Sequence, residues 1–586
     1  MAIFKKRDEA APRRKMGCLG KTLIIIAAIC CFSVLEGLLM KSFMRTPATN
    51  LEPNSVYKLT LNGQVVERIS EENPFEALMG QVPGRSVTTT YGLNEILSNI
   101  REAKSNANIK GIYLYDGQLA MGQATAKAIR DALVDFKESG KFIIAYSSHY
   151  GEVNYYLASV ADKIYLNPTG TVEWHGYGAM KMYYTRLLEK IGVEMQIVKV
   201  GTFKSAVEPY FRTSMSEADK AQTLHYVQGL WNQTVASVSE ARGISQDQLN
   251  AYADEFMEIQ CEEKYLAYHF VDSLIYQDGM DSVLAQWVGE RDYHLVSHSA
   301  MSNVKRADNK AKDKVAVVYA EGGITDTEGD GIVGTEMVKT LKSVLKADDV
   351  KAVVFRVNSP GGSADASEQI WHAVQLLREK GLPVVVSMGD YAASGGYYIS
   401  CGADYIYAEP NTLTGSIGIF GTIPNMGPLR EKVGLDIDEI GTNKHTSMAS
   451  SLRMRAMNAE EKAMMQAMVE RGYELFTSRC AEGRHMLQDE IKKIGEGRVW
   501  LGTDALKLGL VDNLGSIEDA INKAAQLAGL TTDFATVSYP AKKDSFEELM
   551  KLFTKDMPEE ERLLMQVREF CSQPRVMALA PVVEIK

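Results

Sequence analysis

The residue types that could do chemistry in this sequence gather around one serine. Ser394 stands in YAASGG (391–396), between the apolar run VVVSM and the run GYYISCGA. The first run predicts a buried strand and the second a helix, so we expect Ser394 at a strand-to-helix turn. There the helix N-terminus and the Gly395 N–H favour negative charge, and the hydroxyl could attack a carbonyl carbon. The alternative is an ordinary helix N-cap, a position where serine is common.

A second segment could assist such a serine. NSPGG (358–362) comes directly after the apolar run KAVVFRV, which predicts another buried strand. Proline fixes the turn, and the two glycines allow backbone N–H groups to approach another atom closely. This pattern is typical of a loop that binds a developing oxyanion.

A serine nucleophile also needs a neighbouring base to take its proton. Only nine histidines occur, and none lies within 373–444. Lysine can serve where burial lowers its pKa from about 10.4 toward neutrality. Lys204 and Lys444 each end a Gly-Thr-x-Lys segment, so either could be the base, although a solvated surface position is the default for both. His445 is a weaker candidate.

These residues belong to a unit that occurs twice. Segments 109–176 and 350–418 read alike at an offset of about 240 residues, which indicates two copies of one domain. In both, short β-branched runs alternate with amphipathic helical runs, and this predicts α/β domains with largely parallel sheets. The first copy has GQLAM (117–121) in place of NSPGG and Glu152 in place of Ser394. Only the second copy therefore keeps the nucleophile.

Taken together, the motifs resemble the signal peptide peptidase A (protease IV) family in its long, two-copy, membrane-anchored form. The resemblance covers roughly residues 20–540. It rests on NSPGG, YAASGGYYIS, LTGSIG (413–418) and VGTFKSAVEPYFR (200–212). It implies a tandem duplication of the domain shared by the Clp protease subunit and the crotonases, built from repeated ββα units.

The same resemblance implies a function. It is that of a serine endopeptidase with a Ser–Lys dyad, which degrades cleaved signal peptides and other apolar peptides without cofactor or metal and assembles as a homo-oligomer, a tetramer in the family. Two other functions stay open: a crotonase-type acyl-CoA enzyme and a non-catalytic membrane scaffold. Neither needs a Ser–Lys pair.

Residue roles follow from the resemblance as well. The implied set is Ser394 as nucleophile, Lys204 as general base, Gly362 and Gly395 as oxyanion donors, and Ser416 as the residue that orients the lysine. Lys444 is the alternative base, because single-copy relatives take their lysine from the matching position. If the copies pack head to tail, Lys444 would face Glu152 of a neighbouring subunit, and we expect an ion pair there.

The N-terminus predicts a membrane anchor. Residues 22–40 are apolar apart from Glu36, and basic residues crowd the segment before them. Such a run is long enough to span a bilayer, and its basic flank (1–21) should stay in the cytoplasm. We therefore expect a single-pass protein of the inner membrane with its catalytic part in the periplasm. A cleaved signal peptide is the alternative.

Length and composition agree with several packed domains. The chain has 586 residues, of which 45% are hydrophobic, and a net charge of −11, which disfavours nucleic-acid binding. Its seven sparse cysteines suggest neither a disulfide framework nor a zinc site. The expected order is an N-terminal copy (50–300), a linker (301–314), a C-terminal copy (315–540) and a helical tail (541–586).

Overall fold

The computed structural model describes residues 48–60, 62–69, 89–115, 117–306, 311–449, 453–531, 533–541, 577–579 and 584–585. The predicted basic tail (1–21), the predicted anchor (22–40) and most of the predicted helical tail lie outside the described residues. Within those ranges, no helix is both long and apolar enough to cross a membrane.

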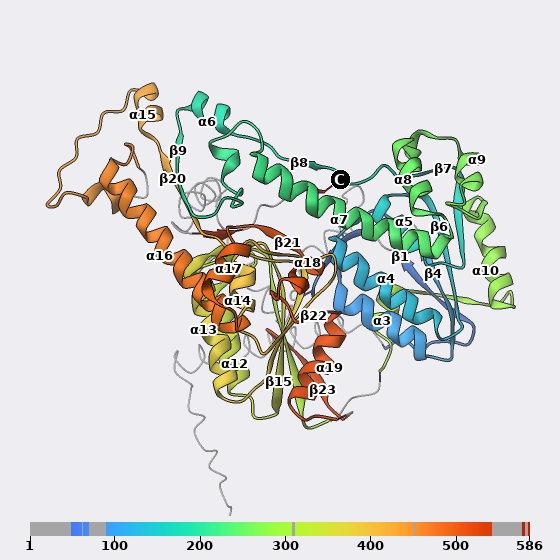
Figure 1. Ribbon diagram of the computed structural model, residues 1–586. Helices are drawn as coiled ribbons and strands as arrows, with labels where there is room; N and C mark the ends of the chain where they lie inside the picture. Colours follow the sequence, from blue (N-terminus) through green and yellow to red (C-terminus); the bar gives the residue numbers. More distant parts are fainter. Residues whose placement is uncertain are drawn as a thin grey trace, which may run out of the picture.

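The first copy is built on a six-stranded sheet in which all neighbouring strands run parallel, in the order β10-β7-β6-β4-β1-β11. The strands are β1 (Ser55–Thr60), β4 (Ile109–Tyr115), β6 (Phe142–Tyr150), β7 (Lys163–Val172), β10 (Ser273–Leu274) and β11 (His294–Ser297). Helices α3 (Leu93–Ser105), α4 (Gln123–Lys137) and α5 (Glu152–Ala158) alternate with them, and α7 (Glu217–Arg242) lies across both copies (Figure 1).

The second copy repeats this order as β22-β18-β17-β15-β12-β23, again parallel. The strands are β12 (Lys314–Glu321), β15 (Val350–Ser359), β17 (Val384–Ala393), β18 (Tyr405–Ala408), β22 (Asn513–Leu514) and β23 (Ala535–Tyr539). The end of β17 also pairs with β19 (Leu413–Gly415), which pairs with the antiparallel β21 (Val499–Leu501). The predicted duplication and the parallel α/β architecture are thus confirmed.

The continuous apolar runs of the second copy reflect burial on both faces of its sheet. Along β15, Val353 and Phe355 pack in the cluster that includes α13 (Ala364–Glu379), whereas Ala352 and Val354 pack in the cluster that includes α19 (Ile517–Leu527). Successive side chains of a strand point to opposite faces, so a strand covered by helices on both sides must be apolar throughout.

Each copy also contains a second, smaller sheet. In the first it consists of β3 (Thr90–Gly92), β2 (Gly63–Val66) and β5 (Leu119–Ala120), and in the second of β14 (Ile332–Val333), β13 (Ile324–Thr325) and β16 (Gly361–Ser363). The second sheet continues through β24 (Met577–Leu579) and β20 (Phe420–Asn425) to β9 (Glu194–Lys199). Because β9 comes from the first copy, the two copies are interlocked, and Figure 1 shows β9 beside β20.

One segment differs from the sequence-based expectation. NSPGG is not a free loop: β15 runs on to Ser359, and Gly361–Ser363 form β16, because these backbone groups find partners in β17, β13 and β24. Of the predicted helical tail (541–586), the structure describes residue 541, Met577–Leu579 and Glu584–Ile585, so a helix in this region stays a prediction. The last two segments are short strands: β24 pairs with β16 and β20, and Glu584–Ile585 pairs with Ala179–Met180.

Candidate active site

Ser394 lies at the turn between β17 and α14 (Gly395–Ser400), as the sequence predicted. Its φ of 57° and ψ of −114° place a non-glycine residue in a rarely populated region, at a cost of about 1–3 kcal/mol. A hydrogen bond from its N–H to the Gly415 carbonyl (2.8 Å) holds the turn. The residue is fully buried, and its side chain makes no cap hydrogen bond to α14. Its hydroxyl is therefore directed elsewhere than in an ordinary N-cap.

The hydroxyl meets the amine of Lys204. Lys204 Nζ lies 2.7 Å from Ser394 Oγ, and it donates to the Ser416 carbonyl (3.0 Å) and to Ser416 Oγ (3.1 Å). A neutral amine has two N–H donors and one lone pair. If the two donors serve the two oxygens of Ser416, the lone pair faces the Ser394 hydroxyl.

Burial sets the protonation state of this amine. Lys204 is fully buried, and loss of hydration lowers its pKa well below the ordinary value of a lysine. The ring of Phe420, which is itself buried, has its centroid 6.0 Å from Nζ. The site thus supplies a lysine that can be an uncharged base at moderate pH.

Lys204 reaches the second copy because the chain after β9 is held there. β9 pairs with β20, and the next residue, Val200, donates its N–H to the Ile419 carbonyl (3.0 Å). Phe203 then donates to the Glu496 carbonyl (2.9 Å). At Gly497, an added Cβ would lie 2.6 Å from the Cβ of Lys204, so only glycine permits this approach.

The glycine segment lies against the same turn. Gly362, in β16, pairs with Ile324 of β13. An added Cβ on Gly396 would lie 2.5 Å from the carbonyl oxygen of Ser359, so the backbone of this segment packs on the first turn of α14. Gly395 is the first residue of that helix. The backbones of both predicted oxyanion residues are therefore next to the serine turn.

The alternative base has other partners. The Lys444 side chain is exposed and forms an ion pair with Glu460 of the same chain. Glu152 is buried, and its Oε1 accepts hydrogen bonds from the N–H groups of His175 and Gly176 (both 2.8 Å). The expected pairing of Lys444 with Glu152 of a neighbouring subunit concerns a second chain and stays a prediction.

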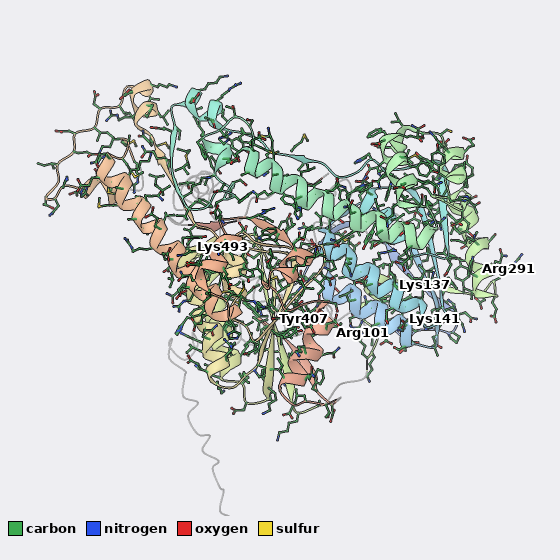
Figure 2. All side chains as sticks on the ribbon, in the orientation of Figure 1. Arg101, Lys137, Lys141, Arg291, Tyr407 and Lys493 are labelled. Carbon is green, nitrogen blue, oxygen red and sulfur yellow. The ribbon has the colours of Figure 1, made fainter. Side chains whose placement is uncertain are left out.

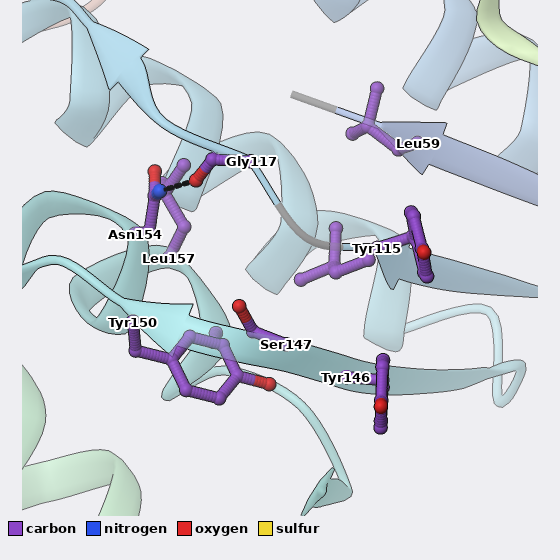
Figure 3. A pocket seen from close by; sticks show the side chains of 10 residues that line it. Leu59, Tyr115, Gly117, Tyr146, Ser147, Tyr150, Asn154 and Leu157 are labelled. Carbon is purple, nitrogen blue, oxygen red and sulfur yellow. Dashed lines mark hydrogen bonds between the residues drawn. The ribbon is translucent and has the colours of Figure 1, made fainter. Parts of the chain in front are cut away.

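In the first copy, the turn between β6 and α5 corresponds to the turn that carries Ser394. Tyr155 and Tyr397 mark equivalent positions, because each donates its hydroxyl to a backbone carbonyl at 2.9 Å, of Phe270 and Leu510. Near this turn lies a small cavity of about 30 Å³, drawn in Figure 3. Its lining residues are Leu59, Leu114, Tyr115, Gly117, Tyr146, Ser147, Tyr150, Asn154, Leu157 and Ala158. No lysine is among them, so the first copy offers no second dyad there.

The space between β16 and β20, beside the glycine segment, holds an extended segment of the chain itself. The chain's own Met577–Leu579 occupies it as β24, antiparallel both to β16 and to β20, with Ala578 opposite Gly362. Strand addition of this kind recognises a peptide through its backbone. The backbone of β16, which contains Gly362, is therefore paired with an extended segment in this structure.

Sequence reasoning missed the residues that join the two copies around the site. Glu67 of the first copy binds Arg356 and Asn358 of the second, and Asp390 of the second copy binds the first turn of α4. No local motif marks Glu67 or Asp390, because each of these contacts joins segments more than 250 positions apart.

Comparison with known proteins gives consistent results. The chain matches the model of Peptidase family S49 at residues 135–289 and again at 376–531, once in each copy. It is 38% identical over 487 residues to Protease 4 of Salmonella typhi, covering 80% of this chain and 78% of the relative. To Protease 4 of Haemophilus influenzae it is 34% identical over 516 residues, covering 84% and 82%.

More distant relatives follow. Serine protease SPPA, chloroplastic, of Arabidopsis thaliana is 29% identical over 497 residues, covering 83% of this chain and 71% of the relative. Among solved structures, a membrane-bound stomatin-specific protease in complex with a substrate peptide matches at 17% identity and a TM-score of 0.26, covering 42% of this chain and 100% of that one.

Proposed function

Because this chain belongs to peptidase family S49 and is a serine peptidase, we propose that it is an endopeptidase that degrades apolar peptides, cleaved signal peptides among them, with Ser394 as nucleophile and Lys204 as general base. The observation that carries the proposal is the 2.7 Å separation of Lys204 Nζ and Ser394 Oγ in a buried setting. A base within hydrogen-bond reach of the nucleophile is the geometric requirement for this chemistry.

In the proposed reaction, neutral Lys204 takes the proton of the Ser394 hydroxyl as Oγ bonds to the carbonyl carbon of the scissile peptide. The N–H groups of Gly362 and Gly395 would bind the resulting oxyanion. When the C–N bond breaks, Lys204 returns the proton to the leaving amine. Water then attacks the acyl carbon while Lys204 accepts its proton; when the bond from that carbon to Ser394 Oγ breaks, Lys204 returns the proton to Oγ and the carboxylic acid product leaves. Ser416 holds the lysine through both of its oxygens.

A peptide substrate is supported by the strand pairing at β16 and β20. The chain's own Met577–Leu579 pairs with both strands next to Gly362, and an extended substrate in its place would pair in the same way. Strand pairing forms hydrogen bonds with backbone groups only. The position between β16 and β20 would therefore accept many peptide sequences. Phe420, which lies opposite Met577 on β20, is apolar, which favours an apolar residue beside it.

Covalent labelling tests the proposal. We expect a serine-reactive phosphonate to add one mass increment to the wild-type protein, mapped to Ser394 by tandem mass spectrometry, and none to Ser394→Ala. A crotonase-type acyl-CoA enzyme or a non-catalytic scaffold would leave Ser394 unlabelled. Labelling of both proteins to the same extent would refute Ser394 as the nucleophile.

The membrane anchor (22–40) and a periplasmic active site complete the proposal. The support is the apolar run after a basic segment. We expect the full chain to fractionate with membranes and a chain starting at residue 41 to be released. Protease added to spheroplasts should digest the catalytic part, whereas protection of that part in intact spheroplasts would place it in the cytoplasm.

Self-association, as a tetramer, belongs to the same proposal. Apolar side chains are exposed on α6 (Thr185–Ile191), at the end of α15 (Gly427–Val433) and along the segment that follows α15. They are Leu187, Ile191, Val433, Leu435, Ile437 and Ile440. In Figure 1, α6 and α15 project together from β9 and β20, away from both central sheets. Exposed apolar patches are typical of contact surfaces. Comparing the sedimentation of the wild type with that of a variant carrying a charged residue in place of Ile440 would test whether this patch is a contact surface.

A further inference from the structure

The two copies meet at a buried carboxylate. Glu67 follows β2 of the first copy and reaches the carboxyl end of the central sheet of the second. Its Oε2 accepts from Arg356 Nε (2.8 Å) and its Oε1 from Arg356 Nη2 (3.0 Å). Glu67 is 3% exposed and Arg356 is 2% exposed. Paired hydrogen bonds between arginine and carboxylate fix orientation as well as distance, so Glu67 is held rigidly.

The same carboxylate binds the first residue of NSPGG. Asn358 Nδ2 donates to Glu67 Oε1 (3.0 Å), while Asn358 Oδ1 accepts the N–H of Tyr391 (3.1 Å). Asn358 ends the regular part of β15 just before the glycines, and Tyr391 stands on β17 three residues before Ser394. Asn358 thus ties the strand that leads to the glycine segment to the strand that leads to the serine, and Glu67 holds Asn358.

A second contact from the first copy reaches the same strand. Asp390, adjacent to Tyr391, accepts hydrogen bonds from the N–H groups of Ala124 (2.8 Å) and Thr125 (2.9 Å), in the first turn of α4, and from Thr125 Oγ1 (2.6 Å). The first copy therefore supports the ends of both β15 and β17 in the second copy. Lys204, in contrast, is held through the separate contacts of Phe203 with Glu496 and of its own Nζ with Ser416.

We propose that Glu67 is a positioning residue for the oxyanion site: through Asn358 it sets the spacing of Gly362 from Ser394. The proposal rests on the function proposed above, because it assumes that Gly362 binds the oxyanion. The first copy then supplies two groups to the active site, the base Lys204 and the carboxylate that orders the backbone of the second copy. Losing Glu67 should disturb the oxyanion donors and leave the dyad intact.

The test uses the full-length protein and a fluorogenic apolar peptide. For Glu67→Gln we expect kcat to fall by about tenfold or more, since a displacement near 1 Å costs up to about 10²-fold. KM should stay within about twofold, and the pH at half-maximal kcat/KM, which reports Lys204, should not move. Asn358→Leu should lower kcat likewise, and the double variant Glu67→Gln/Asn358→Leu should be no slower than the slower single variant, because both act through one contact.

Glu518→Gln is the matched control. It breaks another ion pair between the copies, Arg101 with Glu518 (2.5 Å), which is half exposed. Figure 2 labels Arg101 on α3 next to α19, at the outer border of the two copies. We expect wild-type kcat from this control, because a solvated pair contributes little and touches no part of the site.

The outcomes separate the two proposals. Wild-type kcat in folded Glu67→Gln, strictly additive effects in the double variant, or an equal loss in Glu518→Gln would each overturn the role of Glu67. If Glu67→Gln does not fold because Arg356 is left unpaired, Asn358→Leu decides: reduced kcat supports the role and wild-type kcat overturns it. Full activity of Ser394→Ala in the same assay would instead overturn the proposed function.

Discussion

Replacing Gly362 with alanine should impair acylation while leaving the Ser394–Lys204 pair in place. A Cβ at this position would lie 2.6 Å from the backbone nitrogen of Ile324 and closer still to its carbonyl oxygen. Comfortable carbon contacts begin at about 3.5 Å, so β16 must move away from β13 by about 1 Å. Neither atom of Ile324 can yield, because both belong to the backbone of a paired strand.

That displacement sets the expected size of the effect. Misplacing a catalytic group by about 1 Å costs up to about 10²-fold, and losing one oxyanion donor costs about 10²–10³-fold in kcat. We therefore expect Gly362→Ala to lower kcat by about 10²–10³-fold, with a smaller change in KM. The assay is steady-state hydrolysis of a fluorogenic peptide, together with the rate of phosphonate labelling of Ser394, which should fall in parallel.

Gly323→Ala is the control for this change. Gly323 lies next to Ile324, yet an added Cβ would have its nearest neighbour, the Gly361 carbonyl oxygen, at 4.0 Å. It should keep wild-type kcat and melting temperature. If folded Gly362→Ala hydrolyses peptide within about threefold of the wild type, the assignment of the oxyanion site to this segment is refuted.

Three further predictions concern the lysines and Ser416. Lys204→Ala should abolish peptide hydrolysis and Lys444→Ala should retain it, because only Lys204 contacts Ser394; full activity of Lys204→Ala in the same assay would reverse the assignment. Lys204→Met should raise stability to urea at pH 7, because the unfolded lysine (pKa about 10.4) binds a proton that the buried one resists. Each unit by which burial lowers the folded pKa is worth about 1.4 kcal/mol, and the gain should shrink as pH rises toward about 10.4; a gain independent of pH would contradict this account. Ser416→Ala removes one of the two oxygens that accept from Lys204 Nζ and should lower kcat about tenfold with KM unchanged; an unaltered kcat would show that the Ser416 carbonyl alone orients the amine.

Local patterns determined the elements of each copy and the place of the serine. The runs VVVSM and KAVVFRV are apolar at successive positions because helices cover both faces of the sheet, so each predicts a buried strand by itself. The turn that carries Ser394 is equally local, since it needs only a strand, a small residue and a helix start. The repeat, likewise, is visible from the residues alone.

The local pattern left two lysines open and only the family resemblance favoured Lys204; the tertiary structure placed Lys204 against the serine, and it alone decided which residues support the site. Lys204 and Lys444 share the same local pattern, but only the pairing of β9 with β20 brings Lys204 across 190 positions to Ser394. Glu67 carries no motif, and its partners Arg356 and Asn358 are 289 and 291 positions away. The role of a buried charged residue such as Glu67 depends on the groups that pair with it. Here those groups come together only when the two copies pack against each other.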